Sequence, residues 1–192
     1  MVAQGNPALD FDGSDDYVDC ENDADLQMGT HDLTVEFWFK TSASAVQKII
    51  ANGATNSSTA GYAIKMLSNG KIRTEFNDGS TSGAKNNDTA VNDGNWHHVA
   101  VVYDRSDNVS VCIDGICSTE DLTTVTGNCD NNSSFVLGVK SSTNTDQAFT
   151  GILDEVRIWS AALSEATFEE WMYKPIESDH NNYDNLGAYY QM

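Results

Sequence analysis

The stretch that decides the fold is Ser110-Val111-Cys112-Ile113-Asp114-Gly115-Ile116-Cys117. Alternating apolar residues closed by Asp114-Gly115 are a strong signal for a two-residue β-hairpin turn. Such a turn places Ile113 opposite Ile116 and Cys112 opposite Cys117. The second pair out from the turn exchanges no backbone hydrogen bonds, so its Cα atoms lie roughly 4.5 Å apart, at the short end of the range that a disulfide bridges. This stretch therefore predicts antiparallel β structure, a Cys112–Cys117 disulfide and an oxidising, extracellular compartment.

The two remaining cysteines are Cys20 and Cys129. Four cysteines allow three pairings, and with Cys112 and Cys117 joined we expect Cys20 and Cys129 to be bridged to each other. No apolar run approaches the ~20 residues of a membrane span, and residues 1–5 have neither the charged nor the apolar part of a signal peptide. We therefore expect a secreted protein, without membrane insertion, whose exported precursor is longer than this chain.

Acidic residues dominate the charge of the chain, with 29 Asp and Glu against 10 Lys and Arg and a formal net charge of −19. Duplex DNA or RNA would be repelled, because phosphate binding needs a basic surface. An anionic membrane surface is excluded by the same argument. Two interpretations of the acidity stay open: a solvated surface suited to salty water, where self-repulsion is screened, and a supply of hard oxygen ligands for calcium.

The hydrophobic period is two along most of the chain, which predicts β-strands. In the segment 32–40, Leu33, Val35, Phe37 and Phe39 share one face, and Trp38 lies on the other. The other expected strands span 61–67 and 71–76 (joined by a tight turn at Asn69-Gly70), 96–103, 134–139 and 151–159. Strands at this spacing, separated by polar turns, indicate an all-β antiparallel sandwich or barrel in a single domain.

One short helix is expected after the last strand. Ser164 is a suitable N-cap, Glu165 falls in the first turn, and Pro175 lies beyond the end of the segment through Phe168 and Trp171. We expect this helix to be a lid on an open edge of the sandwich. Residues 1–176 are assigned to the domain and residues 177–192 to a C-terminal extension, in which 185–190 is either a last strand or the start of a following domain.

Four segments in order carry a family resemblance. They are Ala8–Val18, Leu33–Lys40, Asn95–Asp104 and Gly151–Trp159, the last followed by Ala162-Leu163-Ser164-Glu165. This series, over roughly residues 8–173, resembles the laminin-G-like, concanavalin-A-like jelly rolls, a group that includes the pentraxins and many modules of microbial surface proteins. The resemblance implies two curved antiparallel sheets packed face to face, a structural calcium ion at the rim, and binding of glycans, proteins or matrix.

Catalysis is not expected. The glucan hydrolases that share this architecture carry two glutamates around an aspartate on one strand, and no Glu-x-Asp-x-x-Glu segment occurs in this chain. Glycoside hydrolysis needs two carboxylates about 5 to 9 Å apart, and Glu36 is the single mid-strand candidate. His97 and His98 are neighbours on a strand and point to opposite faces, so they cannot share one metal ion.

The resemblance also implies a calcium site. In related jelly rolls an aspartate that opens the last long strand binds the ion, with help from the first strand and the loop after it. Asp154 matches this aspartate by position, Asp12 is the first-strand candidate, and Gly29 or nearby loop carbonyls are further ligands, since calcium takes 6 to 8 oxygens. The alternative is that Asp154 pairs with Arg157 or a backbone N–H, and that Asp12 only forms a turn before Gly13.

Jelly rolls bind sugars on a concave face lined with aromatics or at rim loops. Aromatic rings pack on the C–H face of a pyranose, and carboxylates and amides bind its hydroxyls. We expect Trp38 or Tyr62 as the platform, although a place in the core is the alternative for Trp38. The segment 77–95 is expected to be the longest loop and to supply the polar contacts. Its candidates are Asn77, Asp78, Asn86, Asn87 and Asp88.

The sequence thus predicts a secreted, calcium-stabilised jelly-roll module that binds carbohydrate or a cell-surface ligand and catalyses no reaction. A protein–protein adhesion or spacer module of a multidomain surface protein is the first alternative. A divergent glycosidase is the second, and the sequence gives it no support.

Overall fold

The computed structural model describes residues 7–53, 59–121 and 124–192 of the chain. One set of strands comprises β1 (Leu9–Asp12), β3 (Leu33–Lys40), β8 (Trp96–Tyr103), β9 (Asn108–Ile113), β10 (Ile116–Asp121), β12 (Thr150–Trp159) and β13 (Leu186–Tyr190). The other set comprises β2 (Val18–Asp19), β4 (Gln47–Gly53), β5 (Gly61–Met66), β6 (Ile72–Asn77), β7 (Ser82–Asn86) and β11 (Phe135–Leu137). The helical segments are η1 (Ala24–Leu26), α1 (Glu165–Trp171) and η2 (Tyr183–Asn185).

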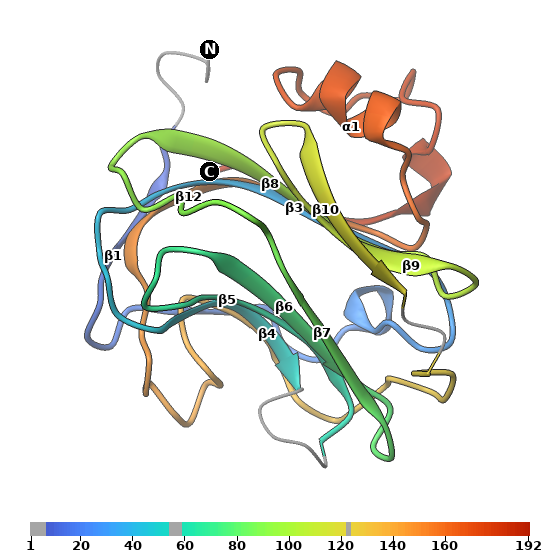
Figure 1. Cartoon of the computed structure of the whole chain (residues 1–192), viewed down its shortest axis with the longest axis horizontal. Helices are drawn as coiled ribbons and strands as arrows, with labels where there is room; N and C mark the ends of the chain where they lie inside the picture. Colours follow the sequence, from blue (N-terminus) through green and yellow to red (C-terminus); the bar gives the residue numbers. More distant parts are fainter. Residues whose placement is uncertain (1–6, 54–58, 122–123) are drawn as a thin grey trace.

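These strands form two antiparallel sheets that stack face to face (Figure 1). The seven-stranded sheet has the order β1-β12-β3-β8-β9-β10, with β13 also paired to β12, and the six-stranded sheet has the order β2-β11-β4-β5-β6-β7. The expected jelly-roll sandwich is therefore confirmed. Within the C-terminal segment, β13 pairs with β12 and is a strand of this same sandwich.

The β9–β10 hairpin has the predicted register. Ile113 pairs with Ile116 and Cys112 with Cys117, and the two cysteines form a disulfide with their Cα atoms 3.9 Å apart. Asp114 and Gly115 have φ values of 51° and 86°, which is the left-handed backbone that a two-residue hairpin turn requires. The β5–β6 hairpin differs from its prediction, because Met66 pairs with Ile72 and the connection therefore spans residues 67–71 rather than two residues.

The main core lies between the two sheets. Val35, Phe37 and Phe39 point into it from β3, as the alternation predicts, and are fully buried. From the facing strands, Phe76 and Tyr103 meet edge to face with ring centroids 5.0 Å apart. Burial of such aromatic and β-branched side chains is the main force that holds the sheets together.

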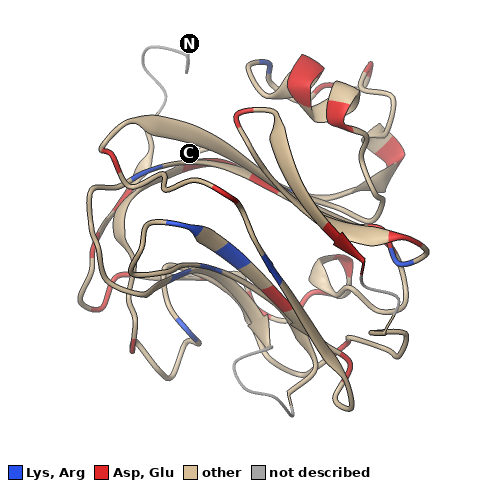
Figure 2. Cartoon of the chain, in the orientation of Figure 1, with Lys and Arg blue, Asp and Glu red and all other residues tan. Residues whose placement is uncertain are grey.

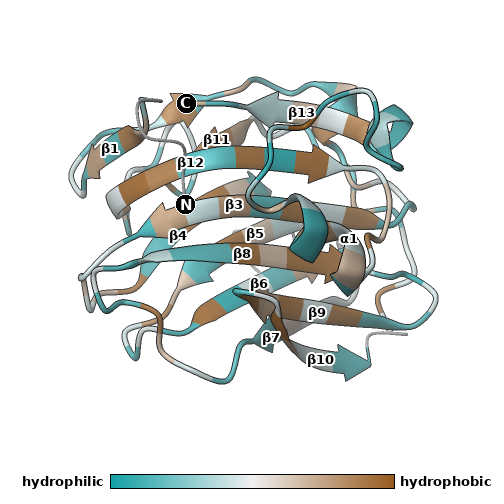
Figure 3. Cartoon of the chain, turned by 90° about the horizontal axis from the view of Figure 1, so that it is seen from above, coloured by the Kyte–Doolittle hydropathy of each residue, from teal (hydrophilic) through white to brown (hydrophobic). Residues whose placement is uncertain are grey.

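A second apolar cluster covers the outer face of the seven-stranded sheet. Phe168 and Trp171 of α1 pack there with Trp159 of β12, and Figure 3 shows α1 lying over this face rather than at an edge. The predicted N-cap is confirmed, since Ser164 Oγ accepts a hydrogen bond from Thr167 N–H. The expected position at an open edge is wrong. The helix instead buries apolar side chains, such as Val102 and Trp159, that point outward from the central strands of this sheet. Within the described residues, no helix is long and apolar enough to cross a membrane.

The segment 77–95 is not one long loop. Its residues Ser82–Asn86 form β7, the edge strand that pairs with β6 from Asn77↔Ser82 to Arg73↔Asn86. The sequence of this strand lacks an apolar alternation because an edge strand is paired on one side only and its side chains are partly exposed. β4 was not predicted from the sequence either. It contributes Lys48 to the outer face of the six-stranded sheet, described below.

The expected Cys20–Cys129 bridge is wrong, because both thiols are free. Each has a polar partner of its own: Cys129 Sγ accepts a hydrogen bond from Arg105 Nη1 at 3.1 Å, and the Cys20 thiol is hydrogen-bonded to the Tyr190 side chain. Burial raises the pKa of both thiols, so they are kept in the neutral form. The prediction paired Cys20 with Cys129 by elimination and did not consider that both thiols could stay free.

Candidate functional site

The residues predicted to bind calcium do not come together. Asp12 pairs with Thr150 at the start of β12, and the four residues from there to Asp154 span about 13 Å of extended strand. Gly29 lies just before Leu33, the first residue of β3. β1, in contrast, pairs with the part of β12 that lies beside Lys40, the last residue of β3. The length of β3 between them is about 20 Å or more, so these three residues cannot form one site.

Asp154 has a structural role. Its side chain is 2% exposed, and Oδ1 accepts a hydrogen bond from the backbone N–H of Glu155 at 2.8 Å. A bulge between Asp154 and Arg157 interrupts the pairing with β3. Burial and the neighbouring Glu155 carboxylate raise the pKa of Asp154. This is the alternative in which the carboxylate satisfies a backbone N–H.

Asp12 belongs instead to an acidic turn with Asp15 and Asp16. Carboxylate oxygens of the three residues lie within 4.8 Å of one another, and all three side chains are exposed. Backbone hydrogen bonds hold this turn, since Ser14 N–H donates to Asp12 Oδ1 at 2.7 Å and Asp12 N–H donates to Asp16 Oδ2 at 3.0 Å. Three oxygen donors so close together fit a hard cation such as calcium. Asp15 and Asp16 were missed, although their closeness to Asp12 in the sequence was a usable signal.

Trp38 and Tyr62 are not sugar platforms. Trp38 is 6% exposed under the segment after α1, and its Nε1 donates a hydrogen bond to the Met172 carbonyl at 2.9 Å. Tyr62 is fully buried between the sheets, and its hydroxyl donates to the Leu26 carbonyl at 2.8 Å. Trp38 therefore has the buried place that was its alternative, and Tyr62 is a core residue as well.

Asn77 and Asp78 shape the turn before β7. Asn77 Oδ1 accepts from Gly79 N–H at 2.6 Å. Asp78 accepts from three backbone N–H groups, and although burial raises its pKa, these donors on Thr81, Ser80 and Gly127 lower it well below the usual range. Their side chains are thus occupied by the backbone, as is usual for turn-forming Asx residues.

The remaining three candidates line a polar groove of about 260 Å³ beside β6 and β7. Asn87 is buried and holds the loop, because its Oδ1 accepts from Ile72 N–H at 2.7 Å and its Nδ2 donates to the Thr89 carbonyl at 2.6 Å. Asp88 is exposed, and Asn86 is half-buried. The groove is lined by Lys71, Arg73, Ala84, Lys85, Asn86, Asn87, Asp88 and Glu120.

The groove continues into a row of cations on the outer face of the six-stranded sheet. The register pairs Lys48 with Lys65, Lys65 with Arg73 and Arg73 with Asn86. Directly opposed residues of antiparallel strands point to the same face, so these four side chains form one row across β4, β5, β6 and β7. Figure 2 shows the resulting blue segments on these strands of an otherwise acidic chain. We call this row, with Glu75 and the adjoining groove, the basic face.

Glu75 holds the basic face together. Its carboxylate lies 2.5 Å from Lys65 Nζ, 3.0 Å from Arg73 Nε and 3.3 Å from Lys48 Nζ. Burial raises the pKa of Glu75, but the three cations outweigh it and lower the pKa. Burial lowers the pKa of Lys48, whose ammonium also feels Lys65 and Lys140, while Glu75 opposes this. The arrangement fixes several N–H donors in place before any ligand arrives.

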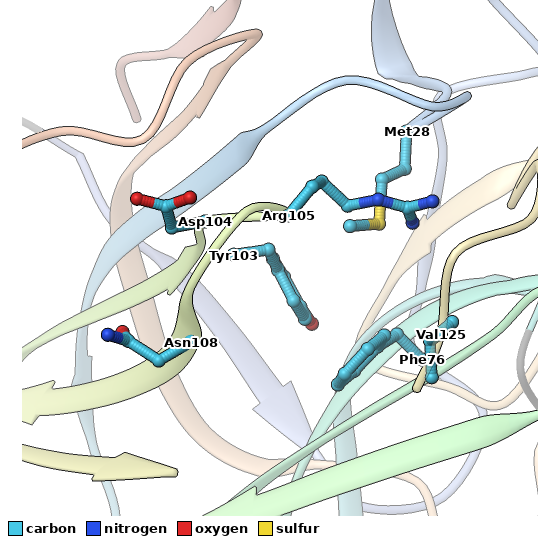
Figure 4. A pocket seen from close by; sticks show the side chains of 7 residues that line it. All are labelled: Met28, Phe76, Tyr103, Asp104, Arg105, Asn108 and Val125. Atoms are coloured by element: carbon cyan, nitrogen blue, oxygen red, sulfur yellow. The ribbon is translucent and has the colours of Figure 1, made fainter. Parts of the chain in front are cut away.

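Two other recesses lie elsewhere among the described residues. A groove of about 400 Å³ runs between α1 and the β9–β10 hairpin, with the Cys112–Cys117 disulfide in its wall. A cavity of about 10 Å³ lies at the end of the core, where the ring of Tyr103 sits between Arg105 and Phe76 (Figure 4). The latter volume holds about one water molecule.

The histidines have separate partners, as the strand geometry predicts. His97 Nδ1 lies 2.7 Å from Asp114 Oδ2, and His97 Nε2 lies 3.2 Å from Asp93 Oδ1. His98 Nε2 lies 3.2 Å from Glu36 Oε2 on the other face, under α1. Glu36 is therefore buried against His98 and does not face a groove.

Comparison with known structures agrees with this fold. The binding domain of Paraclostridial Mosquitocidal Protein 1 is 15% identical and superposes with a TM-score of 0.68, over 88% of this chain and 46% of that one. The sialidase module CBM40 of Ruminococcus gnavus, bound to α2,3 sialyllactose, is 15% identical with a TM-score of 0.68, over 88% of this chain and 97% of that one. Domains LG4-5 of the mouse laminin α1 chain are 17% identical with a TM-score of 0.63, over 86% and 46%.

This chain thus spans less than half of the toxin and laminin chains. No curated protein sequence matches the chain. The profile of a laminin G family, described as the concanavalin A-like lectin/glucanases superfamily, matches residues 12–167. The resemblance expected from the four ordered segments is confirmed, and the chain belongs to the laminin G branch of the concanavalin A-like lectin/glucanase superfamily.

Proposed function

We propose that this chain is an extracellular carbohydrate-binding module without catalytic activity, and that the saccharide binds at the basic face. The observation that carries the proposal is the polar groove of about 260 Å³ beside the ordered row of Lys65, Arg73 and Asn86. The fold supports it, because two of the superposed solved structures are the binding domain of a toxin and a sialidase module with sialyllactose bound.

The chemistry of the basic face suits sugar hydroxyls. Arg73 and Asn86 are already linked by a hydrogen bond of 3.2 Å, so both side chains are held in fixed positions. Guanidinium and amide groups donate to hydroxyl oxygens, and the carboxylates of Asp88 and Glu120 accept from hydroxyl protons. A preorganised site of this kind loses less side-chain entropy when a ligand binds.

A glycan array followed by calorimetry tests the proposal. We expect the protein to bind a defined saccharide, and Asp88→Ala to weaken that binding. The matched control is Asp179→Ala, an equally exposed aspartate in the segment after α1. Absence of binding to every saccharide, or equal weakening by the two substitutions, would contradict the proposal.

The alternative is an adhesion or spacer module that binds another protein. Its supporting observation is Ile116, which is 78% exposed at the tip of the β9–β10 hairpin next to the larger groove. Ile116→Ser would weaken binding to a protein partner and leave saccharide binding unchanged.

Secretion and calcium binding are parts of the same proposal. The Cys112–Cys117 disulfide supports an oxidising compartment. We propose the acidic turn of Asp12, Asp15 and Asp16, rather than Asp154, as the calcium site, and the closeness of the three carboxylates supports this choice. There it would stabilise the end of β1 by neutralising three neighbouring carboxylates.

A further inference from the structure

The cations of this chain are distributed very unevenly. Of its 10 Lys and Arg residues, six lie on the six-stranded sheet or in the segments next to it. They are Lys48, Lys65, Lys71, Arg73, Lys85 and Lys140. The strands β4 to β7 contain four of these cations and a single acidic residue, Glu75. A chain with a formal net charge of −19 therefore has one face on which positive charge is in excess.

Glu75 does not neutralise this excess. Its one carboxylate is shared by Lys48, Lys65 and Arg73. Lys85 points across the sheet edge and lies 3.6 Å from Glu120, whose side chain is largely exposed. An exposed pair at this distance is weak. The row of three cations thus keeps about two positive charges beyond what Glu75 supplies.

The ion pairs within the fold do not account for three cations, Lys48, Lys65 and Arg73, placed side by side. Placing Lys48, with a side chain only 4% exposed, beside a second lysine costs desolvation and repulsion. Apart from Glu75, the outward positions of β5, β6 and β7 beside the cations are Ala63, Ala84 and Asn86. A chain with 29 acidic residues has an ample supply of counter-charges, yet these positions carry none.

We infer that the saccharide bound at the basic face is acidic, and that its anionic group binds over Arg73 and Lys65. This inference rests on the proposed function and specifies its ligand class. The two residues are directly opposed on β6 and β5, so their Cβ atoms are about 5 Å apart. Glu75 Oε1 already lies 2.5 Å from Lys65 Nζ and 3.0 Å from Arg73 Nε, so the anionic group binds the N–H donors of these two side chains that Glu75 does not occupy. Arg73 is a third exposed, and its planar guanidinium binds carboxylate or sulfate oxygens with good geometry.

A saccharide fits this face better than an acidic peptide that adds as a strand. The cations lie on the face of paired strands, where the backbone N–H and C=O groups are already bonded to neighbouring strands. A peptide therefore has no backbone edge to pair with at Lys65 and Arg73. The adjoining groove, with Asn86 and Asp88, provides partners for hydroxyl groups around the anionic group.

The test compares matched pairs of saccharides by calorimetry at low ionic strength. The probes are lactose, 3′-sialyllactose and 3′-sulfolactose, and oligogalacturonate with its methyl ester. We expect each acidic member to bind at least about tenfold more tightly than its neutral partner. The sialyl and sulfo arms distinguish a carboxylate from a sulfate as the preferred group.

Two substitutions locate the site. Arg73→Gln and, as a second variant, Lys65→Gln should each remove most of the preference for the acidic saccharide. The matched control is Lys174→Gln, which removes one positive charge from a lysine over the Trp171 ring, on the seven-stranded side of the molecule. Circular dichroism confirms that each variant is folded.

The outcomes separate this inference from the proposed function. Equal affinity for neutral and acidic saccharides would overturn the inference and leave the proposed function in place. Acidic saccharides that bind Arg73→Gln and Lys65→Gln as well as the parent protein would overturn the location. Absence of binding to every saccharide would overturn both.

Discussion

The indole Nε1 of Trp159 donates a hydrogen bond to Glu36 Oε1 at 2.7 Å, in the buried layer beneath α1. The other carboxylate oxygen of Glu36 lies 3.2 Å from His98 Nε2. One side chain thus joins β12, β3 and β8 across the outer face of the seven-stranded sheet. Burial raises the pKa of Glu36, but His98, Arg157 and Trp159 outweigh it and lower the pKa. The carboxylate is therefore a structural link between strands.

Removal of the indole N–H should destabilise the fold. Trp159→Phe keeps most of the apolar volume but leaves a buried carboxylate oxygen without its donor, at a cost of about 1–3 kcal/mol. Urea unfolding followed by circular dichroism measures the loss. The control is Trp96→Phe, at a partly exposed position, which should change the free energy of unfolding much less. Equal losses for the two variants would mean that the Glu36 hydrogen bond contributes nothing.

The sequence predicted those parts of the fold that rest on local pattern. The β9–β10 hairpin follows from Asp114-Gly115, and the inward face of β3 follows from the alternation of Leu33, Val35, Phe37 and Phe39. Trp38 was misplaced because both faces of β3 are covered, one by the opposite sheet and one by the α1 segment. A period of two identifies two faces of a strand, but it does not say whether the second face meets solvent.

The candidate site was largely invisible in the sequence. Lys48, Lys65 and Arg73 are far apart along the chain, and only the register of β4, β5 and β6 makes them neighbours. Without a prediction for β4, that register could not be derived. Asn87 and Asp88, which were predicted as ligand contacts from their place in a polar segment, both line the groove.

The number of free thiols distinguishes the structure, in which Cys20 and Cys129 are free, from the Cys20–Cys129 disulfide that we expected from the sequence. Denatured but unreduced protein should react with two equivalents of a thiol reagent, from Cys20 and Cys129, because only Cys112 and Cys117 are bridged. After reduction the value should rise to four. The Cys20→Ser variant, unreduced, should give one. A parent protein without reactive thiols would contradict the free state of both residues.

The disulfide should contribute modestly to stability. It joins residues only 5 apart in sequence, and closing so short a loop restricts the unfolded chain little, which gives roughly 2 kcal/mol in the chain-entropy description. Cys112→Ser with Cys117→Ser should therefore lower the free energy of unfolding by about that amount and leave the protein folded. Cys20→Ser serves as the control. Failure of the double variant to fold would show that the hairpin depends on its bridge.

The imidazole of His97 should make stability depend on pH. Partial burial lowers its pKa, but the carboxylates of Asp114 and Asp93 outweigh this and raise it above the usual 6.5. A pKa that is higher in the folded state adds stability below the unfolded value, and this stability disappears as the pH rises through the folded pKa. The pKa of Asp93 is lowered to about 2 by Asn95 and His97, so this carboxylate stays charged throughout the range.

His97→Gln should accordingly reduce the free energy of unfolding more at pH 5.5 than at pH 8.5. Urea unfolding at the two pH values measures the difference. His31→Gln, at an exposed position, is the matched control for the loss of an imidazole as such. A loss for His97→Gln that is the same at both pH values would mean that folding does not raise the pKa of this imidazole.

Calcium should raise the thermal midpoint through the acidic turn. Binding to the native state adds about 2.7 kcal/mol when the free ion is a hundredfold above its dissociation constant. We expect a rise of several degrees between excess EDTA and millimolar calcium, at fixed high ionic strength so that general charge screening is constant. Asp16→Asn should abolish the rise, because it removes one of three carboxylates whose oxygens lie within 4.8 Å of one another.

Asp154→Asn is the control for Asp16→Asn. Asp154 is buried and bonded to the Glu155 N–H, so its substitution should lower the midpoint in EDTA and in calcium by the same amount. The difference between the two conditions would then be unchanged. If Asp154→Asn abolished the calcium effect and Asp16→Asn did not, the ion would bind at the last strand as the family resemblance first implied. If calcium left the midpoint of the parent protein unchanged, the acidity would instead be a property of a solvated surface suited to high salt.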